Sequence, residues 1–94
     1  MNREHVLPMQ IGMIAGSGML PILVADGIRA TGRKVVCIGL RDQFDAALPD
    51  HCDVFSTAGV LQIGKWIRIL RRAKIEETVM VGRVGKARMY EPFR

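Results

Sequence analysis

Apolar positions along the chain fall into two kinds of pattern, short continuous runs and longer amphipathic segments. The continuous runs predict short strands covered on both faces, at residues 11–15, 34–40, 54–57 and 78–82. Between them, apolar residues recur with helical spacing, which predicts helices over 19–30 and 59–72 and one short helical turn over 44–48. Residues 1–9 are a polar lead-in, so we expect the folded domain to span residues 10–94.

Each predicted helix has an apolar side that should face the sheet. In the first helix this side is formed by Leu20, Leu23, Val24 and Ile28, with Pro21 in the first turn and Gly32 as the stop. In the second helix the apolar stripe consists of Val60, Ile63, Ile67 and Leu70. Trp66 flanks this stripe and is expected to pack rather than to stack on a base. The opposite side carries a set of cations that we expect to be solvated: Lys65, Arg68 and Arg72.

Strands that alternate with helices predict a parallel sheet with right-handed crossovers. We therefore expect an α/β fold that is a Rossmann-like half. It should have about four short parallel strands with helices on both faces, in a three-layer α/β/α arrangement. The strands are few, and one sheet edge has little to cover it. Because exposed edges attract partners or further chain, we expect part of a larger protein, or a protomer that forms a homo-oligomer.

The composition narrows the range of expected binding partners but does not identify one. The formal charge is +5 and the sequence pI is about 9.9, which favours an anionic partner: a nucleotide, a nucleic acid or a phosphate-rich membrane face. With five aromatic residues and no recognisable reading motif, nucleic acid is not the expected partner. Two cysteines and no secretory leader favour a reduced, cytoplasmic compartment. The aspartates at 26, 42, 45, 50 and 53 do not form a recognisable metal site.

The segment IAGSGMLP, residues 14–21, carries the main candidate chemistry. Gly16 and Gly18 match the first two positions of the dinucleotide pattern G-x-G-x-x-G, but Pro21 occupies the third, which weakens an NAD or FAD interpretation. The backbone N–H groups of Gly18, Met19 and Leu20 should begin a helix, where free donors suit phosphate oxygens. The alternative is that the glycines only form a tight corner. No His base is evident for a Ser17 nucleophile, so we assign no catalytic residue and expect at most a hydroxyl contact.

A second candidate is GRVGKAR, residues 82–88. The first and fourth strands should be neighbours, and their carboxyl ends should face the same crevice. This would place Gly82, Gly85 and three cations beside the first glycine segment. Arg83 could bind two phosphate oxygens at once, Lys86 would act as a point charge, and Arg88 is the third cation. The alternative is a solvated basic turn.

Two stretches of the chain together resemble the N-terminal domain of the LpxI-type UDP-2,3-diacylglucosamine pyrophosphatases of lipid A synthesis. They are IGMIAGSGMLPILVADGIRATGRKVVCIGL and VMVGRVGKARMY. The resemblance extends from about Gln10 to about Tyr90. It implies a family that hydrolyses UDP-2,3-diacylglucosamine to the lipid monophosphate and UMP. It further implies Mg²⁺ dependence, and a C-terminal domain that carries the acids tied to metal and catalysis.

The resemblance transfers only binding roles to this sequence: substrate-phosphate or sugar contacts from Gly16, Ser17, Gly18 and the loop after the fourth strand. The C-terminal domain is not represented in these 94 residues, so we expect no metal ligand here and negligible hydrolysis by this chain alone. The expected partners are UDP-diacylglucosamine or its lipid product, together with that second domain. The location should be cytoplasmic, with peripheral contact to the inner membrane face as an option. The alternative function is a small non-enzymatic module for nucleotide binding or assembly.

Overall fold

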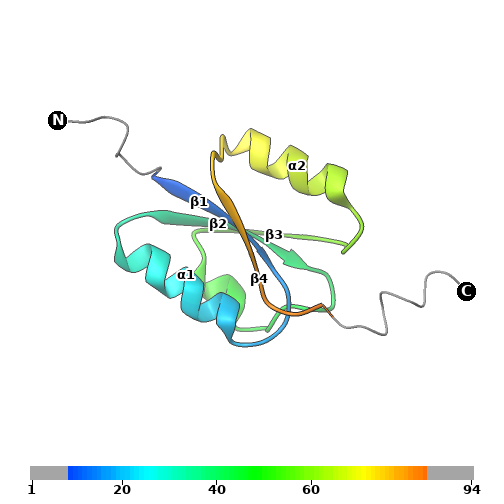
Figure 1. The fold of residues 1–94 in the computed structure, drawn as a ribbon, viewed down its shortest axis with the longest axis horizontal. Coiled ribbons are helices and arrows are strands. Elements are labelled where there is room, and N and C mark those ends of the chain that lie inside the picture. The colour runs from blue at the N-terminus through cyan, green and yellow to red at the C-terminus, as the bar shows by residue number, and fades with distance from the viewer. Residues whose placement is uncertain (1–8, 85–94) are drawn as a thin grey trace, which may run out of the picture.

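The computed structural model describes residues 9–84, which form one four-stranded sheet between two helices (Figure 1). All strand pairs are parallel, in the order β3-β2-β1-β4. Helix α1 lies on one face of the sheet and α2 on the other, so the predicted α/β fold is confirmed. The elements along the chain are β1 (Gln10–Ala15), α1 (Leu20–Ala30), β2 (Lys34–Leu40), the 3-10 helix η2 (Leu48–His51), β3 (Val54–Ala58), α2 (Ile63–Arg72) and β4 (Thr78–Val81).

The core consists of two apolar layers, one on each face of the sheet. Successive strand residues point to opposite faces, so β1 and β2 contribute to both layers. On the α1 face the buried residues include Met13, Val35 and Cys37. On the α2 face they include Ile14 and Ile38. This double burial explains why both strands appear in the sequence as continuous apolar runs.

The predicted apolar side of α1 is only half right: Val24 and Ile28 pack against the core as expected, but Leu20 and Leu23 do not. The buried residues of the helix are Pro21, Ile22 and Ala25, whereas Leu20 and Leu23 are 56% and 59% exposed. The sheet contacts the small Ala25 and the first turn, so the larger leucines are left on the outer side. The predicted stop is present, because Gly32 has a φ of 88° just after the helix.

Helix α2 begins later than predicted, at Ile63 rather than at residue 59. Gln62 and Trp66 bind both backbone groups of Gly59, which holds residues 59–62 in a turn. The Gly59 N–H donates to Gln62 Oε1 (2.6 Å), and Trp66 Nε1 donates to the Gly59 carbonyl (3.1 Å). Trp66 is therefore the buried residue of α2, while Ile63 and Ile67 of the predicted stripe are 52% and 46% exposed.

The helical turn predicted over residues 44–48 is wrong. The short helix is η2, with Pro49 in its first turn, where the missing proline N–H costs nothing. Phe44 instead packs edge to face on Phe55, with ring centroids 5.0 Å apart. Both rings lie over Gly39, where an added Cβ would be 2.8 Å from the Phe44 ring.

Candidate phosphate-binding corner

The turn from β1 into α1, residues 16–20, lies directly against the end of β4. We call these residues the glycine corner. A Cβ at Gly82 would be 2.9 Å from backbone atoms of Gly16, and a Cβ at Gly16 would meet the Arg83 carbonyl. Both positions therefore require glycine, because the two backbone segments approach too closely for a side chain. At Gly82 the φ of 108° is a second reason, since side-chain-bearing residues rarely adopt it.

Ser17 and Arg83 join the glycine corner to the segment after β4. The Ser17 N–H donates to the Arg83 carbonyl (2.8 Å), and the Arg83 N–H donates to the Ser17 carbonyl (3.1 Å). The Ser17 hydroxyl also donates to the Arg83 carbonyl, at 3.0 Å. One residue further back, the Gly16 N–H donates to the Val81 carbonyl (2.8 Å). The two candidate segments are thus neighbours at the carboxyl edge of the sheet.

Three consecutive backbone donors in the glycine corner remain unpaired within the described residues. Gly18, Met19 and Leu20 donate no hydrogen bond there, whereas the next donors, Ile22 and Leu23, both bind the Met19 carbonyl. No side chain in the described part of the chain caps the helix, and no acidic residue lies in its first turn. The start of α1 therefore combines free N–H groups with the positive end of a helix dipole, a combination that suits a phosphate.

Within the described part of the chain, little covers the glycine corner. An added Cβ at Gly18 would have no atom within 4 Å, although its φ of 101° disfavours any side chain. Met19 is 59% exposed, and Arg83 is exposed as well. Arg83 forms no ion pair with any residue in the range 9–84, so its guanidinium is available to an anion.

The structure separates the predicted site residues into groups. Gly18, Met19 and Leu20 have donors without a partner in the described range, and Arg83 supplies a cation. The amides of Gly16 and Ser17 already donate to the carbonyls of Val81 and Arg83. Gly82 allows the backbone after β4 to lie against Gly16. Lys86, together with Gly85 and Arg88, lies outside the described residues. Binding by any of these residues stays a prediction.

A network of polar contacts fixes α1 to the β2–β3 connection. Asp26 and His51 are joined at 2.7 Å between Oδ1 and Nδ1, and Arg29 Nε lies 3.6 Å from Asp53 Oδ2. The same Asp53 oxygen accepts the N–H of Val35 at 2.7 Å. Sequence reasoning missed these contacts, because partners 18 to 25 positions apart carry no local signal.

The two cysteines lie close together, Cys37 in β2 and Cys52 just before β3. A hydrogen bond with the Cys52 thiol, together with burial, raises the pKa of Cys37 far above its ordinary value. The same bond lowers the pKa of Cys52, with a smaller contribution from the Arg29 charge, while burial opposes this shift. Both thiols are free, and Cys52 is only half-buried.

A small hollow of about 180 Å³ lies at the start of β1, and its lining comes from Met9, Gln10, Lys74 and Glu76. The glycine corner follows the carboxyl end of β1, so this hollow is not part of the candidate site. The described residues contain no group of three His, Cys, Asp or Glu side chains that could hold a metal ion.

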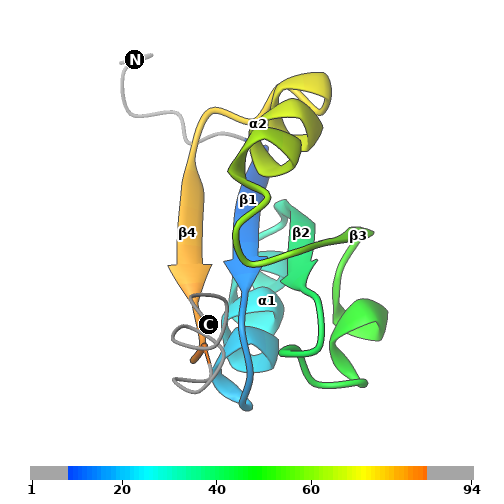
Figure 2. The same ribbon diagram turned by 90° about the vertical axis from the view of Figure 1, so that its right-hand side faces the viewer.

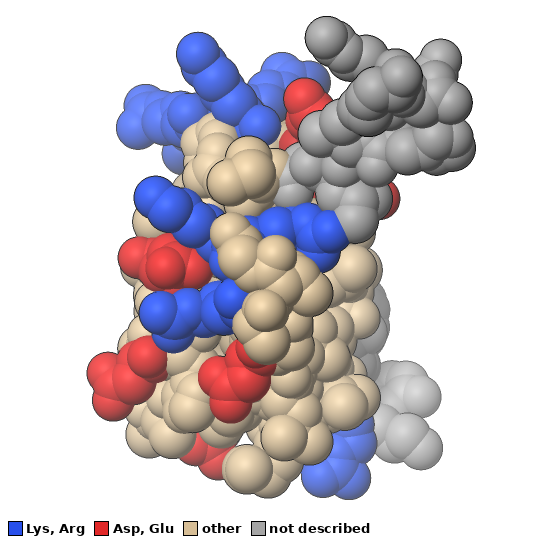
Figure 3. All heavy atoms as spheres, turned by 90° about the vertical axis from the view of Figure 1, so that its left-hand side faces the viewer, with Lys and Arg blue, Asp and Glu red and all other residues tan. Residues whose placement is uncertain are grey.

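Helix α2 and the segment after it carry most of the uncompensated charge. There is no Asp or Glu between Asp53 and Glu76, and Arg68, Arg71 and Arg72 are exposed. Figure 3 shows Lys and Arg side chains gathered at the top of the molecule, the side on which α2 lies in Figure 1. Among the described residues, no helix has the length and apolar character needed to span a bilayer.

The parallel sheet with a helix on each face places the protein in the Rossmann-like α/β class, where anions bind at unpaired donors beyond the strand ends. The family model described as the LpxI N-terminal domain matches residues 10–94, and the chain belongs to this family. The family connects the chain with the UDP-sugar enzymes of lipid A biosynthesis and implies a C-terminal partner domain. No curated protein matches the chain at a significant level.

Proposed function

We propose that this domain holds the diphosphate of UDP-2,3-diacylglucosamine for a pyrophosphatase whose acid–base groups lie on the C-terminal domain of the family. The observation that carries the proposal is the row of donors at Gly18, Met19 and Leu20 that residues 9–84 leave unpaired, at the start of α1 and beside Arg83. Family membership supports the choice of a UDP-sugar over other anions.

In this proposal the domain acts by electrostatic positioning. Three N–H groups would bind nonbridging oxygens of one phosphate, and the Arg83 guanidinium would bind a pair of oxygens. Donors that are fixed before the ligand arrives need no reorganisation when negative charge builds up on the phosphate. The Ser17–Arg83 hydrogen bonds supply this fixation on the protein side.

The magnesium ion that the family implies does not fit the described residues. They bring together no group of three metal-binding side chains, and a hard divalent cation needs several converging oxygens. The proposal therefore assigns the metal and the hydrolytic step to the C-terminal domain. We expect no UMP release when the 94-residue protein is mixed with the lipid nucleotide and Mg²⁺, and magnesium-dependent UMP release would contradict this assignment.

Amide chemical shifts test the binding role directly. UDP-2,3-diacylglucosamine in detergent micelles is titrated into the ¹⁵N-labelled protein, and the largest shifts are expected at Gly18, Met19 and Leu20. Arg83→Gln should weaken binding about tenfold, since a hydrogen bond to a charged group contributes about 1.5 kcal/mol or more. Arg68→Gln on α2 is the matched control and should bind as the unmodified protein does. Shifts confined to other segments, or equal weakening by both substitutions, would exclude the glycine corner.

A second candidate function is an assembly module without enzymatic partners. It is supported by the outer edge of β4, which no other strand among residues 9–84 covers. Retention of UDP-sugar binding by a monomer would favour the first proposal, and a stable homodimer without such affinity would favour the second.

A further inference from the structure

The outer side of α2 carries a stripe of cations. Residues 65–74 contain five Lys or Arg and no Asp or Glu. Lys65, Arg68 and Arg72 follow one another at spacings of three and four residues, so they share one side of the helix. Trp66, the buried residue of α2, lies on the inner side, against the sheet. The stripe therefore points away from the core, and Figure 3 shows Lys and Arg gathered on this side of the molecule.

The charges of α2 are not neutralised within the described structure. On α1, Asp26 contacts His51 and Arg29 lies near Asp53, so both charged residues of that helix have a polar or charged partner. The Lys and Arg side chains of α2 form no ion pair with any residue in the range 9–84. The outer side of α2 is therefore a positive surface without nearby acids.

The folding of α2 does not explain the whole stripe. Arg71 and Arg72 lie in the last turn, where cations interact favourably with the helix dipole. Lys65 lies in the first turn, which has no acidic residue, and a cation there opposes the dipole. Arg68 has a like charge three residues before it and four residues after it, and such pairs destabilise a helix. Two of these four cations thus oppose helix formation, which points to a role in contact with an anion.

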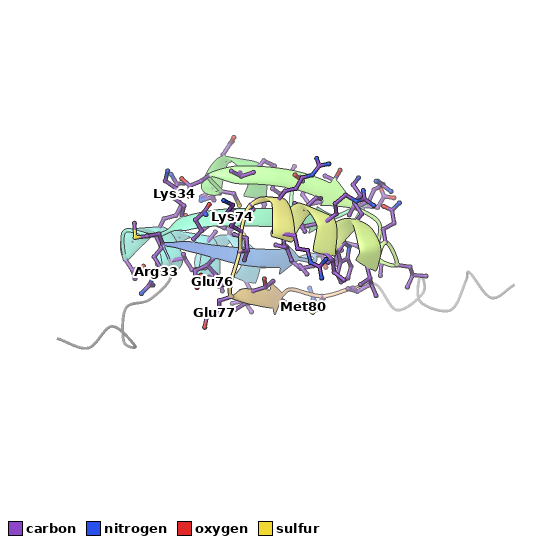
Figure 4. All side chains as sticks on the ribbon, turned by 90° about the horizontal axis from the view of Figure 1, so that it is seen from above. Arg33, Lys34, Lys74, Glu76, Glu77 and Met80 are labelled. Atoms are coloured by element: carbon purple, nitrogen blue, oxygen red, sulfur yellow. The ribbon has the colours of Figure 1, made fainter. Side chains whose placement is uncertain are left out.

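The stripe remains at the surface even where further chain extends the sheet. In the doubly wound class, a strand that follows β4 pairs at its outer edge, and the connecting helix packs beside α2 on the same face. A helix in that position covers a flank of α2 and leaves the outer side uncovered. In Figure 2, α2 forms the top of the described domain. Figure 4 is seen from above and shows no described segment over α2, with Lys74 labelled just beyond its last turn.

The composition of the stripe identifies the class of partner. Protein interfaces are built around apolar and aromatic anchors, and none stands between Lys65, Arg68 and Arg72 on the outer side. Single-stranded nucleic acid needs exposed aromatic rings, whereas the ring of Trp66 is buried and its Nε1 donates to the Gly59 carbonyl. An anionic lipid surface needs neither feature, because its many mobile headgroups adapt to clustered Lys and Arg on a helix.

We propose that the outer side of α2 binds an anionic lipid surface, with Lys65, Arg68, Arg71 and Arg72 among the phosphate headgroups. The contact is peripheral: the helix lies flat on the headgroups and the sheet lies behind it. The glycine corner leads into α1 on the opposite face of the sheet, so the lipid contact uses none of the residues assigned to the substrate phosphate. The two proposals therefore stand or fail independently.

Co-sedimentation with vesicles tests this proposal. We expect the 94-residue protein to bind vesicles of phosphatidylglycerol and phosphatidylcholine at low salt, and not to bind phosphatidylcholine vesicles alone. Binding should be lost in about 1 M NaCl, where the screening length falls to about 3 Å. Arg68→Gln combined with Arg72→Gln should weaken binding about 25-fold, since each cation near an anionic surface contributes about fivefold. Arg33→Gln combined with Arg41→Gln is the charge-matched control and should bind nearly as the unmodified protein does, because these residues flank β2.

A second readout needs no substitution. Bicelles that contain phosphatidylglycerol should shift or broaden the amide signals of α2 in the ¹⁵N-labelled protein and leave those of α1 unchanged. Circular dichroism checks that both double variants keep their helices. Equal weakening by the two double variants would mean that only the net charge matters, and this result overturns the proposal. Binding to phosphatidylcholine alone, signal changes confined to α1, or displacement from the vesicles by an equal charge of duplex DNA also overturns it.

Discussion

Gly82→Ala is the substitution that most directly tests the β1–β4 junction. The new methyl group would lie 2.9 Å from backbone carbon and nitrogen atoms of Gly16, a distance that a real Cβ does not tolerate. The residue must also keep a φ of 108°, a conformation that L-residues rarely adopt. The strained backbone costs about 1–3 kcal/mol, and displacing packed backbone atoms adds a similar amount. We expect a loss of about 3 kcal/mol or more in the free energy of unfolding.

Two other glycines provide controls for this prediction. Gly18 has a φ of 101° but open space around the Cβ position, so Gly18→Ala should show the backbone cost without the clash. Gly27 lies inside α1 with no atom within 4 Å, and Gly27→Ala should stabilise the protein by about 1 kcal/mol through helix propensity. The expected order of stability is therefore Gly27→Ala, unmodified protein, Gly18→Ala and Gly82→Ala.

Urea unfolding followed by circular dichroism measures all of these proteins. The midpoint should fall most for Gly82→Ala, while the slope of the transition stays the same. If Gly82→Ala were as stable as the unmodified protein, or no less stable than Gly18→Ala, the close approach of Gly82 to Gly16 would not exist as described. The register between β1 and β4 would then have to be revised.

Three further predictions concern the core and the cysteine pair. Trp66→Phe removes the hydrogen bond to the Gly59 carbonyl and should lower the free energy of unfolding by about 1 kcal/mol, measured in urea. Asp53→Ala removes the acceptor of a β2 backbone amide and should cost about 1–3 kcal/mol by the same assay, whereas Asp45→Ala at an exposed turn should cost less. The pKa of Cys52 is lowered and that of Cys37 raised, so iodoacetamide should alkylate Cys52 at a lower pH than an ordinary thiol and leave Cys37 unmodified in the folded protein. Mass spectrometry after proteolysis distinguishes the two, and preferential labelling of Cys37 would contradict the assignment.

The sheet was predictable from the sequence because its signals are local. The run at residues 34–40 coincides with β2, since a strand buried on both faces must be apolar throughout. The neighbourhood of the first and fourth strands followed from general rules of parallel α/β topology and is confirmed.

The helix faces and the state of the corner amides were less predictable, because they depend on tertiary contacts. The sequence stripe on α2 is real, but Trp66 fills the space next to the sheet, and the described sheet ends below Ile63 and Ile67. Likewise, both glycines in GSG favour a tight turn. Only the position of β4 determines that the Gly16 amide is bonded, while the Gly18 amide has no partner among the residues that the structure describes.

The hydrogen bonds between Ser17 and Arg83 have a consequence for the kinetics of the domain. They make the donors of the glycine corner depend on a strand more than sixty positions away, so that any local opening of β4 also releases the turn. The amides of Gly16 and Ser17 should then exchange with deuterium only when β4 separates from β1, while Gly18 exchanges at once. Their protection factors thus report how much of the time the anion site is assembled.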